Sequence, residues 1–434
     1  MNETQKSIEE RLYELPENWE WARLGSLVNI KTGKKDSNHG NREGAYPFFT
    51  CAAAPIRSDT YSFEGEAVLL PGNGANVGLA LYYNGKFEAY QRTYVLTSEK
   101  ISIKYVYYHL LLGWERHNRN KQFGSATNYI KLANIKDYRL PLAPLDEQRR
   151  IVEKIERLFA KVEKAAHVVE EVKESVELRR AAILYRAFRG ELGTNLPEEK
   201  NILETAGQWI RTKLIAENMQ PYRIPKNWVW LCLKDFLPPM VSCDPSKLDC
   251  KEFLYVDIDS IDNRQFTIKR PKMINVSEAP SRARRAICKG DVIISMVRPY
   301  LMNVAKVLSD DPALVASTAF YVCRKNEVVN TDYLYYYLLT PFVTNELNIR
   351  AKGHNAPSVR NKEFLELKIP VPPAEEQGRI AKKIAKLLDA LNEEMHITTE
   401  VEERLSFVKQ GILNKAFRGA LGTGEPEKEG GKAR

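Results

Sequence analysis

Three closely spaced aspartates are the residues of this sequence best suited to bind a divalent metal. Asp257, Asp259 and Asp262 lie in the stretch YVDIDSIDN, and carboxylate oxygens are the ligands that calcium and magnesium prefer. The glutamate or histidine that a calcium loop or a nuclease site requires does not follow them. Alternating polar and apolar positions along a strand edge explain the spacing more simply. A nuclease or methyltransferase site at Asp257 and Asp259 stays open as an alternative.

Other signatures of catalysis are absent from the sequence. The glycines between Gly72 and Gly78 lack the spacing of a dinucleotide site or a P-loop, so we interpret this stretch as a turn between strands. The Asn/Asp-Pro-Pro-aromatic motif, with which amino-methyltransferases hold the target amine, does not occur. The six cysteines form no C-x-x-C pair and the six histidines no H-x-x-x-H pair. We therefore expect no catalytic residues, no metal site and no cofactor in this chain.

Clusters of basic residues point to a polyanionic partner. The net charge is +9, because 65 Lys and Arg residues face 56 Asp and Glu residues. Seven cationic residues lie between Arg264 and Arg285 with a single acid, Glu278, and a weaker cluster runs from Lys31 to Arg42. Cations with amides nearby suit phosphate contacts and hydrogen bonds to base edges. A solvated basic loop would explain either cluster alone, but a cluster in each half favours DNA binding.

The residues expected to read DNA fall into one group in each half of the chain. We add the turns at residues 73–76 and 296–303 as second-tier candidates. Each is expected to follow paired strands, at an equivalent place in its half of the chain. The candidates are Lys34, Lys35, Asn38, Asn41, Arg57, Asn73 and Asn76 in the first half, and Arg270, Arg282, Arg284, Arg285 and Arg298 in the second.

An internal repeat indicates how these clusters are positioned. Residues 140–194 align without a gap on residues 369–423 with 22 identities in 55 positions, too many for unrelated segments. A shorter repeat matches residues 15–24 to residues 224–233. Two dissimilar segments, roughly 28–139 and 237–368, lie between the repeats. We infer two copies of one domain fold whose surface chemistry has diverged.

Each long repeat carries the heptad pattern of a coiled coil. Proline precedes each pattern and glycine follows it, at Gly190 and Gly419, which predicts helices of about 44 residues and about 65 Å. Because a single apolar stripe needs a partner, we expect the two helices to pair antiparallel within the chain. Two separate core helices are the alternative. The predicted seam consists of Ile151, Ile155, Leu158, Val162, Val169, Val172, Ile380, Ile384, Leu387, Leu391, Val401 and Leu405.

The expected fold is therefore of the α/β (α+β) class, with two similar globular domains separated by two long antiparallel helices in an intramolecular coiled coil, related by a pseudo-twofold internal repeat. Hydrophobic residues make up 44% and charged residues 28%, which excludes a disordered or membrane-spanning chain. The N-terminus lacks the basic start and apolar core of a signal peptide, so we expect a cytoplasmic protein. The expected boundaries are a domain at 1–140, a helix at 141–190, a linker with a short helix at 191–221, a domain at 222–369, a helix at 370–420 and a disordered tail at 421–434.

Three kinds of motif occur once in each half of the chain. They are the Pro-Leu-x-Glu-Gln-x-x-Ile openings at 144–151 and 373–380, the Ala-Phe-Arg-Gly closings at 187–190 and 416–419, and the Asn-Trp pairs at 18–19 and 227–228. These motifs resemble those of the specificity (S) subunit of type I restriction-modification systems. The resemblance covers almost the whole chain, with two variable and two constant regions in the family's order. The second copy departs from the family's opening motif at Ala374, which replaces leucine.

This resemblance implies a DNA-reading adaptor without catalytic activity. Each variable segment would be a target recognition domain for one half of a bipartite, asymmetric sequence in double-stranded DNA, and the helices would set the unread spacer. Two methyltransferase subunits would bring S-adenosylmethionine for adenine methylation, and restriction subunits that translocate DNA would bring ATP and magnesium. Half-methylated sites would be methylated and unmodified sites would trigger cleavage. The competing hypothesis is a coiled-coil scaffold that bridges two protein partners without reading DNA.

Overall fold

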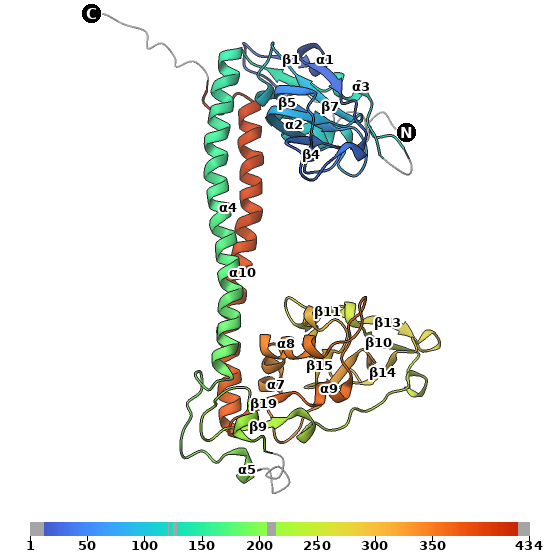
Figure 1. Cartoon of the computed structure of the whole chain (residues 1–434), viewed down its shortest axis with the longest axis vertical. Coiled ribbons are helices and arrows are strands. Elements are labelled where there is room, and N and C mark those ends of the chain that lie inside the picture. Colours follow the sequence, from blue (N-terminus) through green and yellow to red (C-terminus); the bar gives the residue numbers. More distant parts are fainter. Residues whose placement is uncertain (1–12, 120, 125–127, 206–213, 424–434) are drawn as a thin grey trace, which may run out of the picture. The chain divides into compact units, whose positions relative to one another are not determined.

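The computed structural model describes residues 13–119, 121–124, 128–205 and 214–423, and the chain divides into two compact units (Figure 1). Unit 1 comprises residues 1–170 and 399–434, and unit 2 comprises residues 171–398. Each unit combines a globular domain with part of both long helices. The units therefore cut across the sequence-based boundaries, which assign each long helix to a separate segment.

The two long helices are continuous and antiparallel within each unit. Helix α4 (Leu145–Ala187) has 43 residues and helix α10 (Ala374–Phe417) has 44, as the heptad pattern predicts. As the residue numbers rise along α4, the numbers of their partners in and near α10 fall. The pairs are Arg150–Thr423, Lys154–Gly422 and Glu163–Lys409 in unit 1, and Arg179–Glu394, Arg180–Asn392 and Thr194–Glu376 in unit 2.

The helix seam is apolar over most of its length. All twelve predicted seam residues are buried or half-buried. Two polar residues interrupt the pattern in α10, and both have partners. Glu394 forms an ion pair with Arg179 at 2.6 Å, and the buried hydroxyl of Thr398 donates to the Met395 carbonyl oxygen at 2.8 Å. The predicted α/β fold with an internal repeat and long helices is thus confirmed.

The domain of unit 1 is built on a six-stranded sheet in the order β2-β7-β5-β6-β3-β4, in which only β3 and β6 run parallel. Strand β5 supplies the fully buried residues Val68 and Leu70, which form one hydrophobic core with α2, and Leu69, which is buried in a separate cluster with Phe49 and Phe87. The strands are β1 (Glu20–Arg23), β2 (Asn29–Thr32), β3 (Tyr46–Phe49), β4 (Ile56–Ser58), β5 (Phe63–Pro71), β6 (Leu81–Ala89), β7 (Thr93–Thr97) and β8 (Arg139–Leu142), and the helices are α1 (Leu24–Leu27), η2 (Ser37–His39), α2 (Ile103–Asn118) and α3 (Leu132–Lys136).

The domain of unit 2 has a four-stranded sheet, β13-β10-β17-β14, and a three-stranded sheet, β16-β15-β18. Its pair β9-β19 matches the pair β1-β8 of unit 1 in the repeat. The strands are β9 (Val229–Cys232), β10 (Glu252–Val256), β11 (Ile261–Asp262), β12 (Thr267–Ile268), β13 (Lys272–Asn275), β14 (Ala283–Ala286), β15 (Val292–Ser295), β16 (Val304–Lys306), β17 (Leu314–Ser317), β18 (Phe320–Cys323) and β19 (Lys368–Val371). The helices are α7 (Thr331–Leu338), α8 (Pro341–Arg350) and α9 (Asn361–Leu365), with short turns η4 (Leu233–Asp235), η5 (Pro245–Lys247), η6 (Ile258–Ser260), η7 (Val276–Glu278) and η8 (Pro299–Leu301).

The repeated closing motifs pack in the same way in the two units. In unit 1 the ring of Phe417, at the end of α10, lies 5.0 Å from the ring of Tyr105 and 4.8 Å from that of His109. In unit 2 the ring of Phe188, which follows α4, lies 4.9 Å from the ring of Tyr333 and 5.0 Å from that of Tyr337. The closing motif at the end of α10 therefore packs into the domain of unit 1, and the closing motif after α4 packs into the domain of unit 2.

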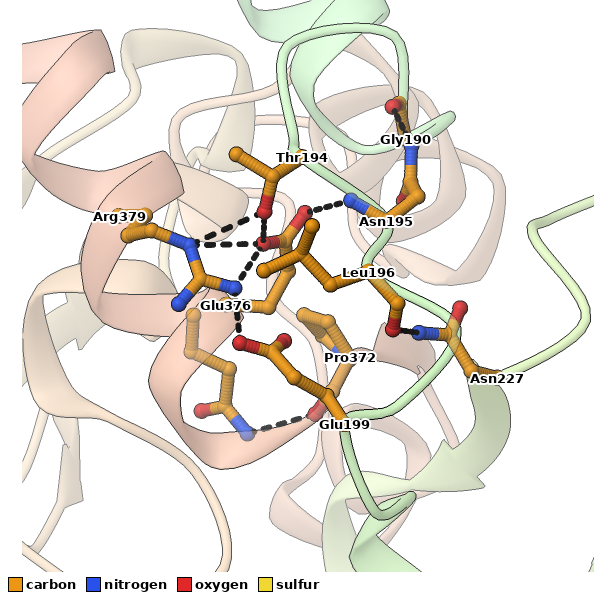
Figure 2. A network of polar contacts seen from close by, with 10 residues as sticks. Gly190, Thr194, Asn195, Leu196, Glu199, Asn227, Pro372, Glu376 and Arg379 are labelled. Atoms are coloured by element: carbon orange, nitrogen blue, oxygen red, sulfur yellow. Dashed lines mark hydrogen bonds and ion pairs between the residues drawn. The ribbon is translucent and has the colours of Figure 1, made fainter.

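A buried carboxylate anchors the start of α10 to the linker, as Figure 2 shows. The Glu376 carboxylate accepts hydrogen bonds from the Thr194 hydroxyl at 2.6 Å and from the backbone N–H of Asn195 at 2.9 Å. Arg379 donates to the same carboxylate and to Glu199. In unit 1 the equivalent Glu147 accepts instead from an indole N–H, that of Trp19 at 3.0 Å. The glutamate of the opening motif is thus a buried acceptor in both units.

The linker and the tail are described in part. Residues 206–213, which include most of the expected linker helix, lie outside the described residues, and the described linker contains α5 (Ile202–Thr205) and η3 (Glu217–Met219). Of the expected tail, Leu421 and Thr423 are buried in unit 1, and residues 424–434 lie outside the described residues. No helix in the described ranges has both the length and the hydrophobicity to cross a membrane.

Candidate nucleic-acid interface

The aspartates that could have bound a metal stabilise the fold of unit 2. Asp257 is the N-cap of η6. It accepts hydrogen bonds from the backbone N–H and the hydroxyl of Ser260, and it forms an ion pair with Lys272. Burial raises the pKa of Asp257, but the hydrogen bonds from Lys272 and Ser260 outweigh it and hold the pKa below its ordinary value. Asp262 pairs with Lys269 at 3.0 Å. Over the described ranges no three His, Cys, Asp or Glu side chains converge as metal ligands would.

The first cluster of unit 1 lies beside strands β4 and β6. Lys35 forms an isolated parallel bridge with Tyr90, just after β6, and the backbone N–H of Asn41 donates to the carbonyl oxygen of Arg57 in β4 at 2.9 Å. The segment from Lys34 to Asn41 therefore runs along this part of the sheet, with Asn38 in η2. All of these candidates are exposed except Lys35, which is half-buried. The structure thus brings the five candidates of the first cluster together.

Two further candidates of unit 1, both asparagines, lie in the turn after β5. Asn73 forms an isolated bridge with Tyr129, and the side-chain amide of Asn76 donates to the Cys51 carbonyl oxygen at 2.8 Å. Both are half-buried. The amide of Asn76 therefore joins two loops of the domain.

The basic run of unit 2 does not form a single patch. Arg270 precedes β13, whereas Arg282, Arg284 and Arg285 lie on or next to β14, and these two strands are the opposite edges of the four-stranded sheet. Arg284 is paired with Asp244 at 3.2 Å. Arg285 is half-buried, and its Nε is a buried donor without a partner. Arg270 and Arg282 are exposed.

Arg298 lies in a separate loop, between β15 and β16. Its backbone N–H donates to the Pro357 carbonyl oxygen at 2.7 Å, and its guanidinium donates to the Asn355 carbonyl oxygen at 3.2 Å. The candidate turn at 296–303 includes Tyr300, whose ring is exposed, but sequence reasoning did not single out the loop that contains Asn355. The signal that could have found that loop is the pair Gly124 and Gly353, each 16 residues before a long repeat.

The chain matches the family described as "Type I restriction modification DNA specificity domain" twice, over residues 16–174 and 225–403. It is 30% identical over 417 residues to the type I restriction enzyme EcoDI specificity subunit of Escherichia coli, covering 94% of this chain and 89% of that protein. It is 22% identical to the MjaVIII specificity subunit of Methanocaldococcus jannaschii, covering 94% of each chain.

Solved structures share the fold. A chain from a study of complex assembly and conformational transition of the type I R-M system is similar with a TM-score of 0.68 and 19% identity, over 94% of this chain and all of that one. The HsdS subunit from Thermoanaerobacter tengcongensis is similar with a TM-score of 0.50 and 19% identity, over 95% of this chain and all of that one. At these identities the likeness concerns the fold alone.

Proposed function

Because the chain belongs to the family of type I restriction-modification specificity subunits, we propose that it reads a bipartite, asymmetric sequence in double-stranded DNA, one half with each unit. The observation that carries this proposal is the duplication of one family domain with different exposed residues in the two copies. Lysines and asparagines dominate the candidates of unit 1 and arginines those of unit 2, so the two copies offer different hydrogen-bond donors and acceptors to base edges. Two different half-sites follow from that difference.

The long helices determine the length of the unread spacer in this proposal. Both α4 and α10 are unbroken over more than forty residues, and apolar seam residues line each of them in both units. A continuous pair of helices resists compression, because shortening it would break main-chain hydrogen bonds. The number of residues in the helices therefore sets the gap between the half-sites.

Catalysis is proposed to reside on partner subunits. Two methyltransferase subunits would bind equivalent surfaces of the repeated helices and supply S-adenosylmethionine, and restriction subunits would supply ATP- and magnesium-dependent translocation and cleavage. The polar groups that could have formed a site in unit 2, such as Asp257 and Asp262, are engaged by Lys272 and Lys269. The chain itself then directs adenine methylation or cleavage without performing either, within the cytoplasm.

The competing hypothesis of a scaffold without DNA reading loses its support, because the matched family is defined by DNA specificity and covers both domains. A scaffold would also not require the exposed cations that both domains carry, such as Lys34 and Arg282.

Expression in a methylation-free bacterial host tests the proposal. The full chain would be produced with its neighbouring methyltransferase subunit, and the host DNA would be sequenced by a single-molecule method that detects methyladenine. We expect a two-part motif with a fixed gap that appears only when this chain is present. Methylation that is the same with the methyltransferase subunit alone would contradict the proposal.

A further inference from the structure

Left-handed backbone conformations are concentrated in the loops of one domain. Of the non-glycine residues with positive φ in the described ranges, Asn195 lies in the linker, and the other three, Phe266 (54°), Arg298 (50°) and Met302 (51°), lie in the domain of unit 2. This conformation brings Cβ close to the backbone and is unfavourable for L-residues. It persists where the surrounding structure holds the chain in place, which occurs most often at binding sites.

The two loops that carry these three residues are joined to each other and to a third loop. The Asn263 side-chain amide donates to the Leu301 carbonyl oxygen at 3.0 Å, which links the β11-β12 turn to the loop around η8. The backbone N–H of Arg298 donates to the Pro357 carbonyl oxygen at 2.7 Å, which links that loop to residues 352–358. The Tyr335 hydroxyl donates to the Phe266 carbonyl oxygen and holds the first turn against α7. We call residues 263–266, 298–302 and 352–358 the three-loop edge.

The three-loop edge is basic and exposes groups that can contact bases. Its segments, NRQF, RPYLM and KGHNAPS, contain no acidic residue. Arg264, Arg298 and Lys352 are exposed, and none of them forms an ion pair within the described part of the chain, in contrast to Lys272 and Arg284. The ring of Tyr300 is 53% exposed. Guanidinium and amide groups read base edges, and an exposed aromatic ring can pack on a base or a thymine methyl group.

Unit 1 builds the same support with different side chains. The bridges Phe123–Tyr129 in unit 1 and Lys352–Ser358 in unit 2 occupy positions that are 229 residues apart, which is the shift of the long repeat. The loop after the central strand pairs with this hairpin in both units, through Asn73 in unit 1 and Val297 in unit 2. Main-chain bridges do not depend on the side chains they carry. The repeat therefore fixes the position of the loops while their side chains are free to differ.

We propose that the three-loop edge is the base-reading surface of unit 2, with Arg298, Tyr300 and Asn355 as specificity-determining residues. This inference rests on the proposed function and names the residues that carry it. The hydrogen bond from the Arg298 guanidinium to the Asn355 carbonyl oxygen uses one of its N–H groups and orients the remaining donors. Because the backbone around Arg298 is held by other loops, little entropy is lost when DNA binds. Arg270 and Arg282, at opposite sheet edges, then contact phosphates at most.

The test compares methylation motifs in the host described above, with the full chain and its methyltransferase subunit. The loop variants are Arg298→Ala, Tyr300→Ala and Asn355→Ala, and the matched controls are Arg270→Ala and Arg282→Ala, which also remove exposed side chains. We expect each loop variant to relax one or two positions in one half of the motif, so that methylation at sites with a substituted base rises about ten- to a hundredfold. The other half and the gap should stay unchanged. The controls should lower methylation at all sites alike.

The outcomes separate this inference from the proposed function. A wild-type chain that yields no two-part motif removes the function and the inference together. If the motif is unchanged in all three loop variants and is relaxed by Arg282→Ala, the inference is overturned and the proposed function stands. If Arg298→Ala abolishes methylation, binding of the assembled complex to DNA is measured at low salt. Retained binding without discrimination supports base reading, and equal loss for every sequence overturns it.

Discussion

The side-chain oxygen of Gln377, in the first turn of α10, accepts a hydrogen bond of 2.6 Å from the backbone N–H of Asn330, the residue that caps α7. The same relationship occurs in unit 1, where Gln148 accepts a hydrogen bond of 3.0 Å from the N–H of Ser102, the cap of α2. Both glutamines are almost completely buried. The repeated glutamine thus joins the start of each long helix to the cap of a domain helix, α2 in unit 1 and α7 in unit 2.

Replacing Gln377 should destabilise unit 2. Its amide also donates to the carbonyl oxygens of Val328 and Pro372, so Gln377→Ala leaves one partly buried donor and two buried acceptors without that partner. We expect a loss of about 1–3 kcal/mol in the free energy of unfolding. Urea unfolding followed by circular dichroism measures it. Gln410→Ala, at an exposed position of α10, should change stability by less than about 0.5 kcal/mol, and an equal effect of the two variants would contradict the prediction.

Gly419 permits a close contact that a side chain would block. Its φ is +71°, and an added Cβ would lie 2.3 Å from Cγ of Pro16. We expect Gly419→Ala to lower the stability of unit 1 by about 1–3 kcal/mol, since both the backbone conformation and the contact become unfavourable. Gly411→Ala is the control, because a Cβ there meets nothing within 4 Å and alanine favours the helix by about 0.5–1 kcal/mol. Thermal unfolding of both variants should move in opposite directions.

The stability of unit 1 should fall in acid because of His109. This side chain is buried against Phe417 and Tyr138, and burial lowers its pKa to about 3. Below the ordinary pKa of about 6.5 the unfolded chain binds a proton that the folded chain does not, so stability declines as pH falls from about 6.5 toward 3. The slope from this group is at most about 1.4 kcal/mol per pH unit.

The pH dependence is isolated by a variant. His109→Gln should lose this part of the decline, so the difference in unfolding free energy between wild type and variant changes below pH 6.5 and is constant above it. Replacement of the exposed His354 by Gln should leave the wild-type profile unchanged. Parallel profiles of wild type and His109→Gln across pH 4 to 8 would show that His109 is not responsible.

Lengthening both long helices should lengthen the unread gap. Seven residues inserted after Glu170 and after Thr399, which are equivalent in the repeat, add one heptad to each helix, or about 10 Å. That length corresponds to about three base pairs of DNA. We expect the methylated motif to keep both half-sites and to gain about three unread base pairs. Insertion into α4 alone should abolish methylation, because the seams no longer match. A gap of unchanged length would refute the role of the helices as a spacer.

Local patterns account for what the sequence predicted correctly. The spacing of Ile151, Ile155 and Val162 defines an apolar stripe, because a helix returns to the same face every three or four residues. The repeat of the opening motif similarly places Glu147 and Glu376 at the same point of two helices. Both inferences depend on neighbours along the chain, so they required no knowledge of the tertiary structure.

The chemistry of individual charges depended on distant residues. Asp244 and Arg284 are 40 positions apart, and only the sheet brings them to 3.2 Å. The run from Arg264 to Arg285 reads as one basic cluster, yet the order β13-β10-β17-β14 places Lys272 at one edge of the sheet and Arg284 at the other. Strand order is set by packing and hydrogen bonds between distant segments, for which the local pattern contains no signal.

The duplication was determined by the sequence alone, but the composition of each unit was not. An apolar stripe shows that a helix face must be covered, and it does not say by which segment. In the structure Phe417, from the end of the chain, covers Tyr105 near its beginning, and Phe188 covers Tyr333. Arg298, which has the left-handed conformation, likewise donates its backbone N–H to the carbonyl oxygen of Pro357, 59 residues away. Burial and main-chain hydrogen bonds between distant segments decide these relationships, because such interactions stabilise the chain only once it has folded.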